Sequence, residues 1–356
     1  MNTGPNLFRF ATSELSQDAV IAYLLSWADP AYKANSDSMH EAGKALVGLF
    51  LTRCLPHLAG ETIQSIVVGR QRDNIDVWME LNDRIFIVIE DKTVTDERVS
   101  QISGYVDQAR TYLNSKGVAF EHVGAIYLKT GNESKSKLLK EYCGVVVRRD
   151  LLDALKPFVE GINDIGSEFW HHLKEIEEGT TAFQAVEITK DWTVPMVEGF
   201  YSLLESELVE KQIASDIKWE YTNNPSGGSC VLYWCWTHFE ALNCELYLQI
   251  VDGGRLQIRL ADWDEKVRSD RMYRALKMAE DLVKEDSRFE QIDIIKSGTY
   301  RGGATAGLVD IFNSSGAGFR VANADHLIDI ERTIERVRLA VEFVRTLGNR
   351  NLQQSV

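Results

Sequence analysis

Residues 75–92 read IDVWMELNDRIFIVIEDK, which is two runs of β-branched and other apolar residues separated by a short polar segment at 82–84. This pattern predicts a β-hairpin with strands at residues 75–81 and 84–90. Side chains alternate between the two faces of a strand, so Glu90 and Lys92 share one face and Asp91 lies on the other. A strand that is otherwise apolar therefore ends in a carboxylate and an ammonium group side by side.

The register of this hairpin decides whether Asp76 can join Glu90. Directly opposed residues of a hairpin share a face, and their numbers add to a constant. A two-residue turn at 82–83 gives the sum 165 and places Asp76 opposite Ile89, with its carboxylate on the wrong face. A three-residue loop at 82–84 pairs Leu81 with Ile85, gives 166, and sets Asp76 across from Glu90. A shared site requires an even sum.

Charged side chains at the end of a buried strand are costly unless something compensates them, and a divalent cation would compensate a carboxylate cluster. Magnesium prefers a few carboxylate oxygens together with water. Asp76 and Glu90 are therefore candidate metal ligands, and Lys92 is a candidate to orient the attacking water or offset charge on a phosphate. The alternative is a surface ion pair between Glu90 and Lys92 with no chemical role.

Elements on either side of the hairpin extend the predicted domain. Helical spacing is found at residues 13–28, 38–55, 99–113 and 134–142, and strand patterns at 63–68, 123–128 and 145–147. The second helix is expected to open on a capping box formed by Ser38 and Glu41. The order predicts an α/β (α+β) domain over residues 1–160, with a mixed sheet flanked by helices.

These motifs resemble the PD-(D/E)XK nuclease superfamily, with Asp76 on the second strand and Glu90-Asp91-Lys92 on the third. Asn74-Ile75-Asp76 stands in place of the Pro-Asp dipeptide. Gln101 and Tyr105 on the following helix resemble the Q-x-x-x-Y pattern of many members, which implies a supporting role in the site. The resemblance covers residues 6–150. It implies a restriction-endonuclease-like fold and phosphodiester hydrolysis with Mg²⁺, for which Mn²⁺ can substitute.

The first two helices also resemble one bacterial and phage-associated branch of that superfamily. Glu14 precedes the sequence LLSW at 24–27, and His40-Glu41-x-Gly43 opens the next helix. This resemblance implies that Glu14 is a further metal-binding acid, and it suggests a role in phage defence or mobile-element biology. Glu41 is the rival, although a capping box already explains it, and Asp18 is a weaker candidate.

The second half of the chain carries no comparable motif. A helical linker is expected at residues 161–190 and an acidic α+β accessory domain at 191–356. Its expected helices are at 195–207, 268–285 and 325–347. Its expected strands are at 217–222, 231–238, 245–251, 256–261, 292–295 and 309–312. This domain is expected to recognise substrate or a partner, and the sequence leaves open whether it forms a homodimer or binds another protein.

Charge and composition limit the function further. The net charge is −14, and it argues against a protein that coats nucleic acid indiscriminately. Residues 1–160 hold 18 basic and 21 acidic side chains, whereas residues 161–356 hold 21 and 32. Six basic residues between 129 and 149 form either a phosphate-facing patch or a solvated surface: Lys129, Lys135, Lys137, Lys140, Arg148 and Arg149.

The five cysteines are odd in number and include no C-x-x-C pair, so they are expected to be free thiols. Neither a signal peptide nor a membrane span is indicated, which favours a cytoplasmic protein without a membrane partner. The sequence therefore predicts a Mg²⁺-dependent nuclease that acts on DNA, with Asp76, Glu90 and Glu14 holding the metal. The rival hypothesis is a catalytically inactive binding or regulatory protein that retains the PD-(D/E)XK fold.

Overall fold

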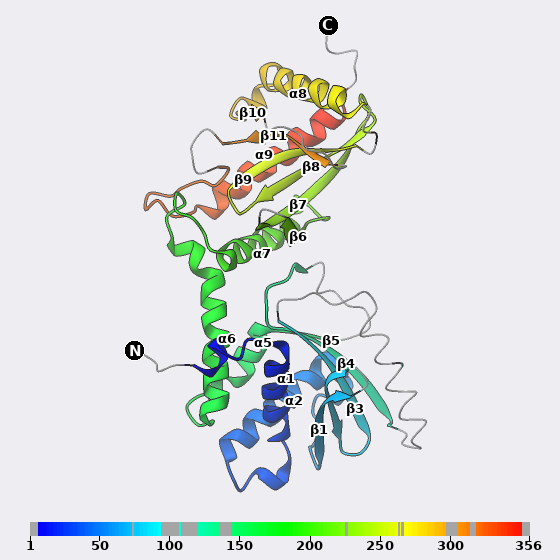
Figure 1. Ribbon diagram of the computed structural model, residues 1–356, viewed down its shortest axis with the longest axis vertical. Coiled ribbons are helices and arrows are strands. Elements are labelled where there is room, and N and C mark those ends of the chain that lie inside the picture. Colours follow the sequence, from blue (N-terminus) through cyan, green and yellow to red (C-terminus); the bar gives the residue numbers. More distant parts are fainter. Residues whose placement is uncertain are drawn as a thin grey trace. The chain divides into compact units, whose positions relative to one another are not determined.

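The computed structural model describes residues 6–72, 75–93, 107, 120–135, 144–224, 227–262, 264, 267–296, 305–313 and 318–350. The chain divides into two compact units, unit 1 (Met1–Glu133 and Lys137–Gly179) and unit 2 (Ser134–Ser136 and Thr180–Val356). Each unit is mixed α/β and contains one sheet (Figure 1). None of the described helices is long and apolar enough to cross a membrane.

The sheet of unit 1 has the strand order β1-β2-β3-β4-β5. The strands are β1 (Ile66–Arg72), β2 (Ile75–Leu81), β3 (Ile85–Lys92), β4 (His122–Lys129) and β5 (Gly144–Val147). The pairs β1–β2 and β2–β3 are antiparallel, whereas β3–β4 and β4–β5 are parallel. The sheet is therefore mixed, and β3 occupies its centre.

The hairpin between β2 and β3 has the three-residue loop that a shared site requires. Leu81 pairs with Ile85 and Val77 with Ile89, so the paired numbers sum to 166. Asn82 and Asp83 adopt φ of 54° and 55°, a left-handed conformation that these two residue types tolerate. The predicted register is confirmed, and it puts Asp76 and Glu90 on the same face of the sheet.

Strand β1 begins three residues later than expected, because residues 63–65 bond to the hairpin loop. The Asn82 side chain accepts hydrogen bonds from the backbone N–H groups of Gln64 (2.7 Å) and Ser65 (3.2 Å). The Asn82 N–H in turn donates to the Ser65 carbonyl (3.0 Å). The loop is thus tied to the chain that precedes the sheet.

Both faces of the sheet are covered, so all eight residues of β3 are buried. Helices α1 (Glu14–Ser26) and α2 (Asp37–Cys54) pack on the face formed by Val77, Met79 and Leu81 of β2 and the odd-numbered isoleucines of β3 (Figure 1). On the other face, Ile75, Phe86, Val88, Ala125 and Tyr127 of β2, β3 and β4 form a smaller hydrophobic cluster. Ile75 departs from the expected alternation, because it joins the second cluster and not the face of Val77.

The start of α2 corrects the expected capping box. Ser36 is the N-cap, and its side chain accepts from the Met39 N–H (3.3 Å), so the helix begins at Asp37. Ser38 lies inside the helix, and the proposed pairing of Ser38 with Glu41 is wrong. Gly43 is a point of close approach, since a Cβ there would lie 2.6 Å from the Ala28 nitrogen. The LLSW and H-E-x-G segments therefore meet where α1 packs on α2.

The last helices of unit 1 are α5 (Arg148–Leu155) and α6 (Asp164–Thr181). Phe169 and Leu173 of α6 belong to the core of unit 1. Most of α6 is therefore part of unit 1, and unit 1 extends to Gly179, past the boundary that the sequence suggested at residue 160. The helices expected at 99–113 and 134–142 fall almost wholly outside the described residues.

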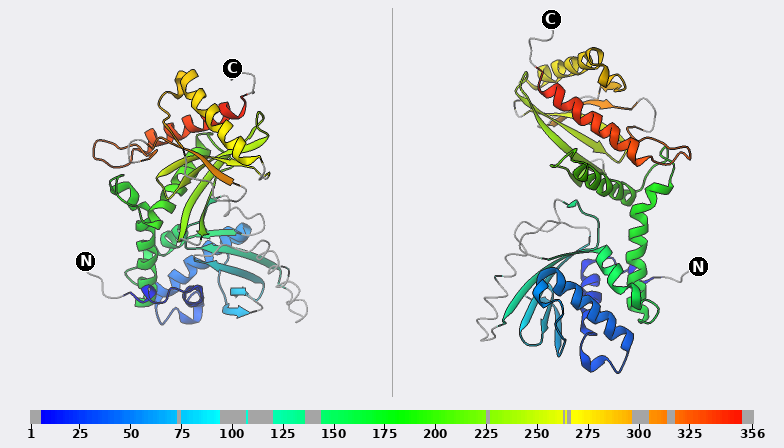
Figure 2. Two further views of the ribbon diagram at one scale, coloured as in Figure 1. Left: turned by 45° about the horizontal axis from the view of Figure 1, so that its top comes forward. Right: turned by 180° about the vertical axis from the view of Figure 1, so that it is seen from behind.

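Unit 2 contains one antiparallel sheet with the order β10-β11-β9-β8-β7-β6. Its strands are β6 (Lys218–Asn224), β7 (Gly227–Phe239), β8 (Cys244–Val251), β9 (Arg255–Ala261), β10 (Ile294–Lys296) and β11 (Thr305–Ile311). Helices α7 (Val194–Glu210), α8 (Arg268–Glu285) and α9 (Ile330–Gly348) share one hydrophobic core with this sheet (Figure 2).

Helix α9 begins five residues later than expected. The preceding segment forms its own turn, in which the Asp329 N–H donates to the Val321 carbonyl (2.7 Å) and the Asn323 N–H to the Leu327 carbonyl (2.8 Å). Asp329 then caps the helix by accepting from the Arg332 N–H. The described cysteines, Cys54, Cys230, Cys235 and Cys244, are free thiols as expected.

Candidate active site

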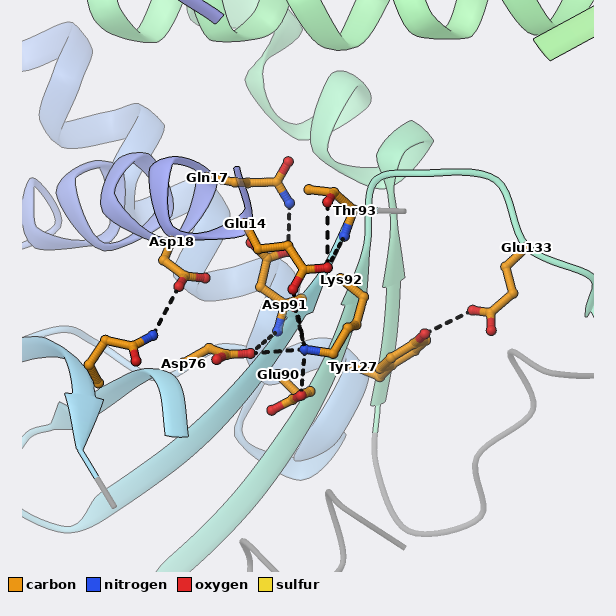
Figure 3. A network of polar contacts seen from close by, with 11 residues as sticks. Glu14, Gln17, Asp18, Asp76, Glu90, Asp91, Lys92, Thr93, Tyr127 and Glu133 are labelled. Carbon is orange, nitrogen blue, oxygen red and sulfur yellow. Dashed lines mark hydrogen bonds and ion pairs between the residues drawn. The ribbon is translucent and has the colours of Figure 1, made fainter. Parts of the chain in front are cut away.

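Three carboxylates converge on the ammonium group of Lys92 at the end of β3 (Figure 3). The Lys92 Nζ lies 2.6 Å from Glu90 Oε1, 3.3 Å from Asp76 Oδ2 and 3.8 Å from Glu14 Oε2. The side chain of Glu90 is 0% exposed, that of Asp76 22% and that of Glu14 32%. The cluster therefore runs from a buried carboxylate to one that solvent and a ligand can reach.

Backbone groups at the end of β3 hold two of these acids. Asp76 Oδ2 accepts a hydrogen bond from the Asp91 N–H (3.2 Å). Glu14, at the first turn of α1, accepts from the Thr93 N–H (3.2 Å). Lys92 Nζ also donates to the Asp91 carbonyl (2.9 Å). Strand β3 thus supplies Glu90 and Lys92 itself and fixes the acids from β2 and α1.

Burial dominates the electrostatics of Glu90. Burial, reinforced by the Asp76 charge, raises the pKa of Glu90 to about 7 even though Lys92 opposes the shift. Tyr127 lies next to Glu90 in the parallel register and adds an aromatic neighbour on that face. For Lys92, burial lowers the pKa, but the carboxylates of Glu90, Asp76 and Glu14 outweigh it and hold the pKa above its ordinary value.

The expected alternative, an ion pair between Glu90 and Lys92, is present, but both residues are buried and the pair does not lie at the surface. Glu90 Oε1 lies against Lys92, whereas Glu90 Oε2 has no hydrogen-bond partner among the described residues. An unbonded oxygen of a buried carboxylate is energetically costly. It marks a position where a proton or a cation would stabilise the site.

A second carboxyl pair lies on the opposite face of the same strand end. Asp91 is completely buried, and its Oδ1 accepts from Gln17 Nε2 of α1 (2.5 Å). Asp18, also of α1, accepts from Gln71 Nε2 (3.2 Å). Burial raises the pKa of Asp91 well above its ordinary value, and the nearby Asp18 raises it further. Burial and the Asp76 charge raise the pKa of Asp18 to about 6.

Gln17 links this pair to the neighbouring strand. Its Oε1 accepts from the Thr130 Oγ1 (2.8 Å), and the Thr130 N–H donates to the Lys92 carbonyl (3.2 Å). One amide therefore connects α1 with the ends of both β3 and β4. The sequence analysis missed Gln17, although its position three residues after Glu14 places it near the same face of the helix and was the available signal.

Asp18 contributes to the buried pair and not to the Lys92 cluster. Glu41, the rival acid, is paired with Lys44 one turn later on α2 (3.0 Å). Glu14, by contrast, contacts Lys92. Gln101 and Tyr105 lie outside the described residues.

Two of the six basic residues between 129 and 149 fit neither the phosphate-facing patch nor the solvated surface. Lys129 and Arg148 are buried, so neither presents its charge at the surface. Arg148 donates to the Thr130 carbonyl (2.6 Å) and to Asn132 Oδ1 (2.9 Å), and it pairs with Glu177 (2.8 Å). Lys137 and Lys140 lie outside the described residues. Arg148 is thus a structural residue that fixes the loop after β4.

The donor set fits a hard divalent cation, although the side chains are not arranged as a ligand shell. Within the described ranges, no three His, Cys, Asp or Glu side chains are grouped so that they could hold a metal ion as they stand. Lys92 lies between the carboxylates and neutralises their charge in part. Asp76, Glu90 and Glu14 nevertheless offer only oxygen donors, and three carboxylates exceed the charge of one ammonium group.

Comparisons of this chain with protein-family models, with curated proteins and with solved structures gave no match.

Proposed function

We propose that unit 1 is a metal-dependent nuclease that hydrolyses phosphodiester bonds in DNA. The observation that carries the proposal is the convergence of Asp76, Glu90 and Glu14 on Lys92 from three separate elements, with Glu90 buried. The order of two antiparallel strand pairs followed by a parallel strand also supports the resemblance to the PD-(D/E)XK superfamily. DNA is the proposed substrate on the strength of that resemblance.

The proposed roles follow from position and chemistry. Asp76, Glu90 and Glu14 would hold Mg²⁺, which on binding lowers the pKa of a coordinated water and stabilises charge on the phosphate. Lys92 reaches all three carboxylates through one flexible chain, so its ammonium can donate to the attacking water or to a phosphate oxygen. Gln101 and Tyr105 are assigned a supporting role by the resemblance alone.

The decisive experiment incubates the full chain with plasmid and linear DNA in the presence of Mn²⁺ or Mg²⁺. We expect cleavage by the wild type and a loss of several orders of magnitude in Glu90→Gln and in Lys92→Ala. Glu41→Gln is the matched control, since it removes the same charge from an acid outside the Lys92 cluster and should cleave normally. Cleavage that survives Glu90→Gln with unchanged metal dependence would place the active site elsewhere.

A non-catalytic binding protein with the same fold is the alternative, and metal binding separates the two. Calorimetric titration of the full chain with Mn²⁺ should show one site that is lost in Glu90→Gln and retained in Glu41→Gln. If the wild type binds no metal and cleaves no DNA, the binding protein is the better interpretation.

A further inference from the structure

A cavity of about 470 Å³ in unit 2 lies between the segment before α7 and the loop before α9. Two arginines, Arg320 and Arg336, contribute to its wall. Glu187, Thr189 and His326 line it as well. This volume falls within the range of small-molecule sites, which is roughly 300–1,000 Å³. The cavity is separate from the Lys92 cluster, and nothing in the nuclease proposal uses it.

Both guanidinium groups are held in place by aromatic rings or backbone carbonyls. The Arg320 guanidinium lies 4.4 Å from the centre of the Trp192 ring. Arg336 Nη1 donates to the backbone carbonyls of Phe319 (3.3 Å) and Arg320 (3.4 Å), and its guanidinium lies over the Phe312 ring (5.5 Å). These contacts orient the two charges and leave donors of Arg336 for a ligand, since a guanidinium carries five N–H groups.

The backbone around the cavity is fixed by hydrogen bonds. The Ile188 N–H donates to the His326 carbonyl (3.0 Å), which joins the segment before α7 to the loop. The Val321 N–H donates to the buried Thr333 Oγ1 (3.0 Å), which joins the loop to α9. The site is therefore formed before any ligand arrives, and binding need not order it.

The charge of Arg336 is incompletely compensated among the described residues. Burial lowers the pKa of Arg336, and the nearby Arg332 lowers it further, although Asp293 opposes the shift. Burial also lowers the pKa of Arg320, against the opposing effects of Tyr201 and Asp191. Among the described residues, no carboxylate forms an ion pair with Arg336. The lining carboxylate, Glu187, pairs with Lys190 (3.7 Å). A second cavity of about 410 Å³ shares Arg336, and its charged lining is mixed: Arg332, Arg338, Glu335 and Glu342.

We propose that this cavity binds the phosphate group of a small phosphorylated ligand, with Arg336 and Arg320 as its principal donors. The planar fork of a guanidinium matches the oxygens of a phosphate and forms charge-assisted hydrogen bonds to them. The phosphate belongs either to a free molecule of mononucleotide size or to a nucleic-acid chain, and the two sources share this chemistry. The binding goes beyond the proposed nuclease activity and requires no metal.

The test is calorimetric titration of the full chain, at constant ionic strength, with inorganic phosphate, a nucleoside monophosphate and a short single-stranded oligonucleotide. We expect saturable binding of a phosphate-bearing probe by the wild type. Arg336→Gln should weaken it about 10- to 100-fold, the effect of losing hydrogen bonds from a charged group. Arg320→Gln is a second variant in case the first fails to fold, which circular dichroism reports.

Matched controls make the result specific. Arg274→Gln removes an arginine of α8 that pairs with Asp270, outside the cavity lining, and should bind as the wild type does. The titration is carried out without divalent metal, so failure of the nuclease proposal leaves this one standing. A nucleoside monophosphate that binds at least as tightly as the oligonucleotide would identify a free ligand, and the reverse order a nucleic-acid chain. Absence of binding by the wild type, or binding unchanged in both folded cavity variants, would overturn the proposal.

Discussion

At the end of β3, the side chain of Glu90 is removed from solvent although an ionised carboxylate is stable mainly in water. Its pKa of about 7 means that the metal-free protein holds a proton there that the unfolded chain would release near pH 4.5. A cation bound at the same oxygens would take the place of that proton. Proton and metal are therefore expected to compete at Glu90.

This competition predicts how stability depends on pH. Folding raises the pKa of Glu90 from 4.5 to about 7. Protonated Glu90 therefore stabilises the folded state fully below pH 4.5, and this stabilisation is lost as the pH rises through 7. The free energy of unfolding of the metal-free protein should fall by about 3 kcal/mol across that window from this group alone. Denaturant titrations at a series of pH values measure it. Glu90→Gln should flatten the profile, and Mg²⁺ should stabilise the wild type more at pH 8 than at pH 5. A profile equally steep in Glu90→Gln would contradict the assignment.

The buried amide of Gln17 gives a second prediction at this scale. Gln17→Leu removes the donor to Asp91 and the acceptor of Thr130, which leaves buried polar atoms without partners. We expect a loss of about 1–3 kcal/mol in the free energy of unfolding, measured by denaturant titration. Gln64→Leu, the same change at an exposed position before β1, should alter it by less than about 0.5 kcal/mol. Equal effects in the two variants would mean that the Gln17 bonds contribute no stability.

At the scale of elements, the length of the loop between β2 and β3 fixes which residues of the two strands share a face of the sheet. Helix α1 then places Glu14 beside Lys92 on one face, and Gln17 and Asp18 beside Asp91 on the other. The loop is itself held by the Asn82 side chain, which donates to the Thr62 carbonyl and to Glu61 and accepts from two backbone N–H groups. Register and anchorage therefore depend on one residue in a left-handed conformation.

Replacing Asn82 should accordingly lower the free energy of unfolding. Asn82→Ala leaves two backbone N–H groups without their acceptor and puts alanine at a φ of 54°, so we expect a loss of about 2–3 kcal/mol in unfolding free energy. Asp83→Gly is the matched variant in the same loop, where glycine suits the φ of 55° and the side chain is exposed, and it should change stability by less than about 1 kcal/mol. Thermal and chemical unfolding compare them. Similar effects of both would show that the side-chain bonds of Asn82 are unimportant.

The acidic charge of the whole molecule disfavours strong non-specific binding of nucleic acid. The net charge is −14, and Lys129 and Arg148, two of the six basic residues between 129 and 149, are buried. Neither can contact a phosphate at the surface. Under the proposed function, we therefore expect affinity for DNA to depend on few phosphate contacts and on the proposed metal site.

Salt dependence measures this directly. Each phosphate contact contributes about −0.9 to the slope of log affinity against log salt, so we expect a slope no steeper than about −4 for duplex DNA. The slope is measured by fluorescence anisotropy over a range of salt concentrations, with the Glu90→Gln variant, which is expected not to cleave. Arg149→Gln, which alters an exposed arginine, should reduce the slope at most slightly. A slope that implied ten or so contacts would require a large basic surface and would contradict this expectation.

The sequence alone determined the parts of this protein that depend on local periodicity. Alternation over residues 75–92 defined both strands of the hairpin, and the polar segment 82–84 located its loop. The sequence left a two-residue and a three-residue loop open, and the structure has the three-residue loop. Helical spacing likewise located α1 and α8, and turn residues separated the strands of unit 2. These features are local because side-chain direction in a strand or helix follows from the backbone within a few residues.

Only the tertiary structure decided what surrounds those residues. The central strand lies under helices on one face, its other face joins a cluster of Phe86, Val88 and Tyr127, and Glu90 is completely buried. No pattern within β3 distinguishes this from a strand end open to water. The same holds for Lys129 and Arg148, which read as surface charges, and for Asp91, whose partner Gln17 is 74 residues away. Burial and long-range hydrogen bonds depend on how distant segments pack, and they set the pKa values on which the chemistry depends.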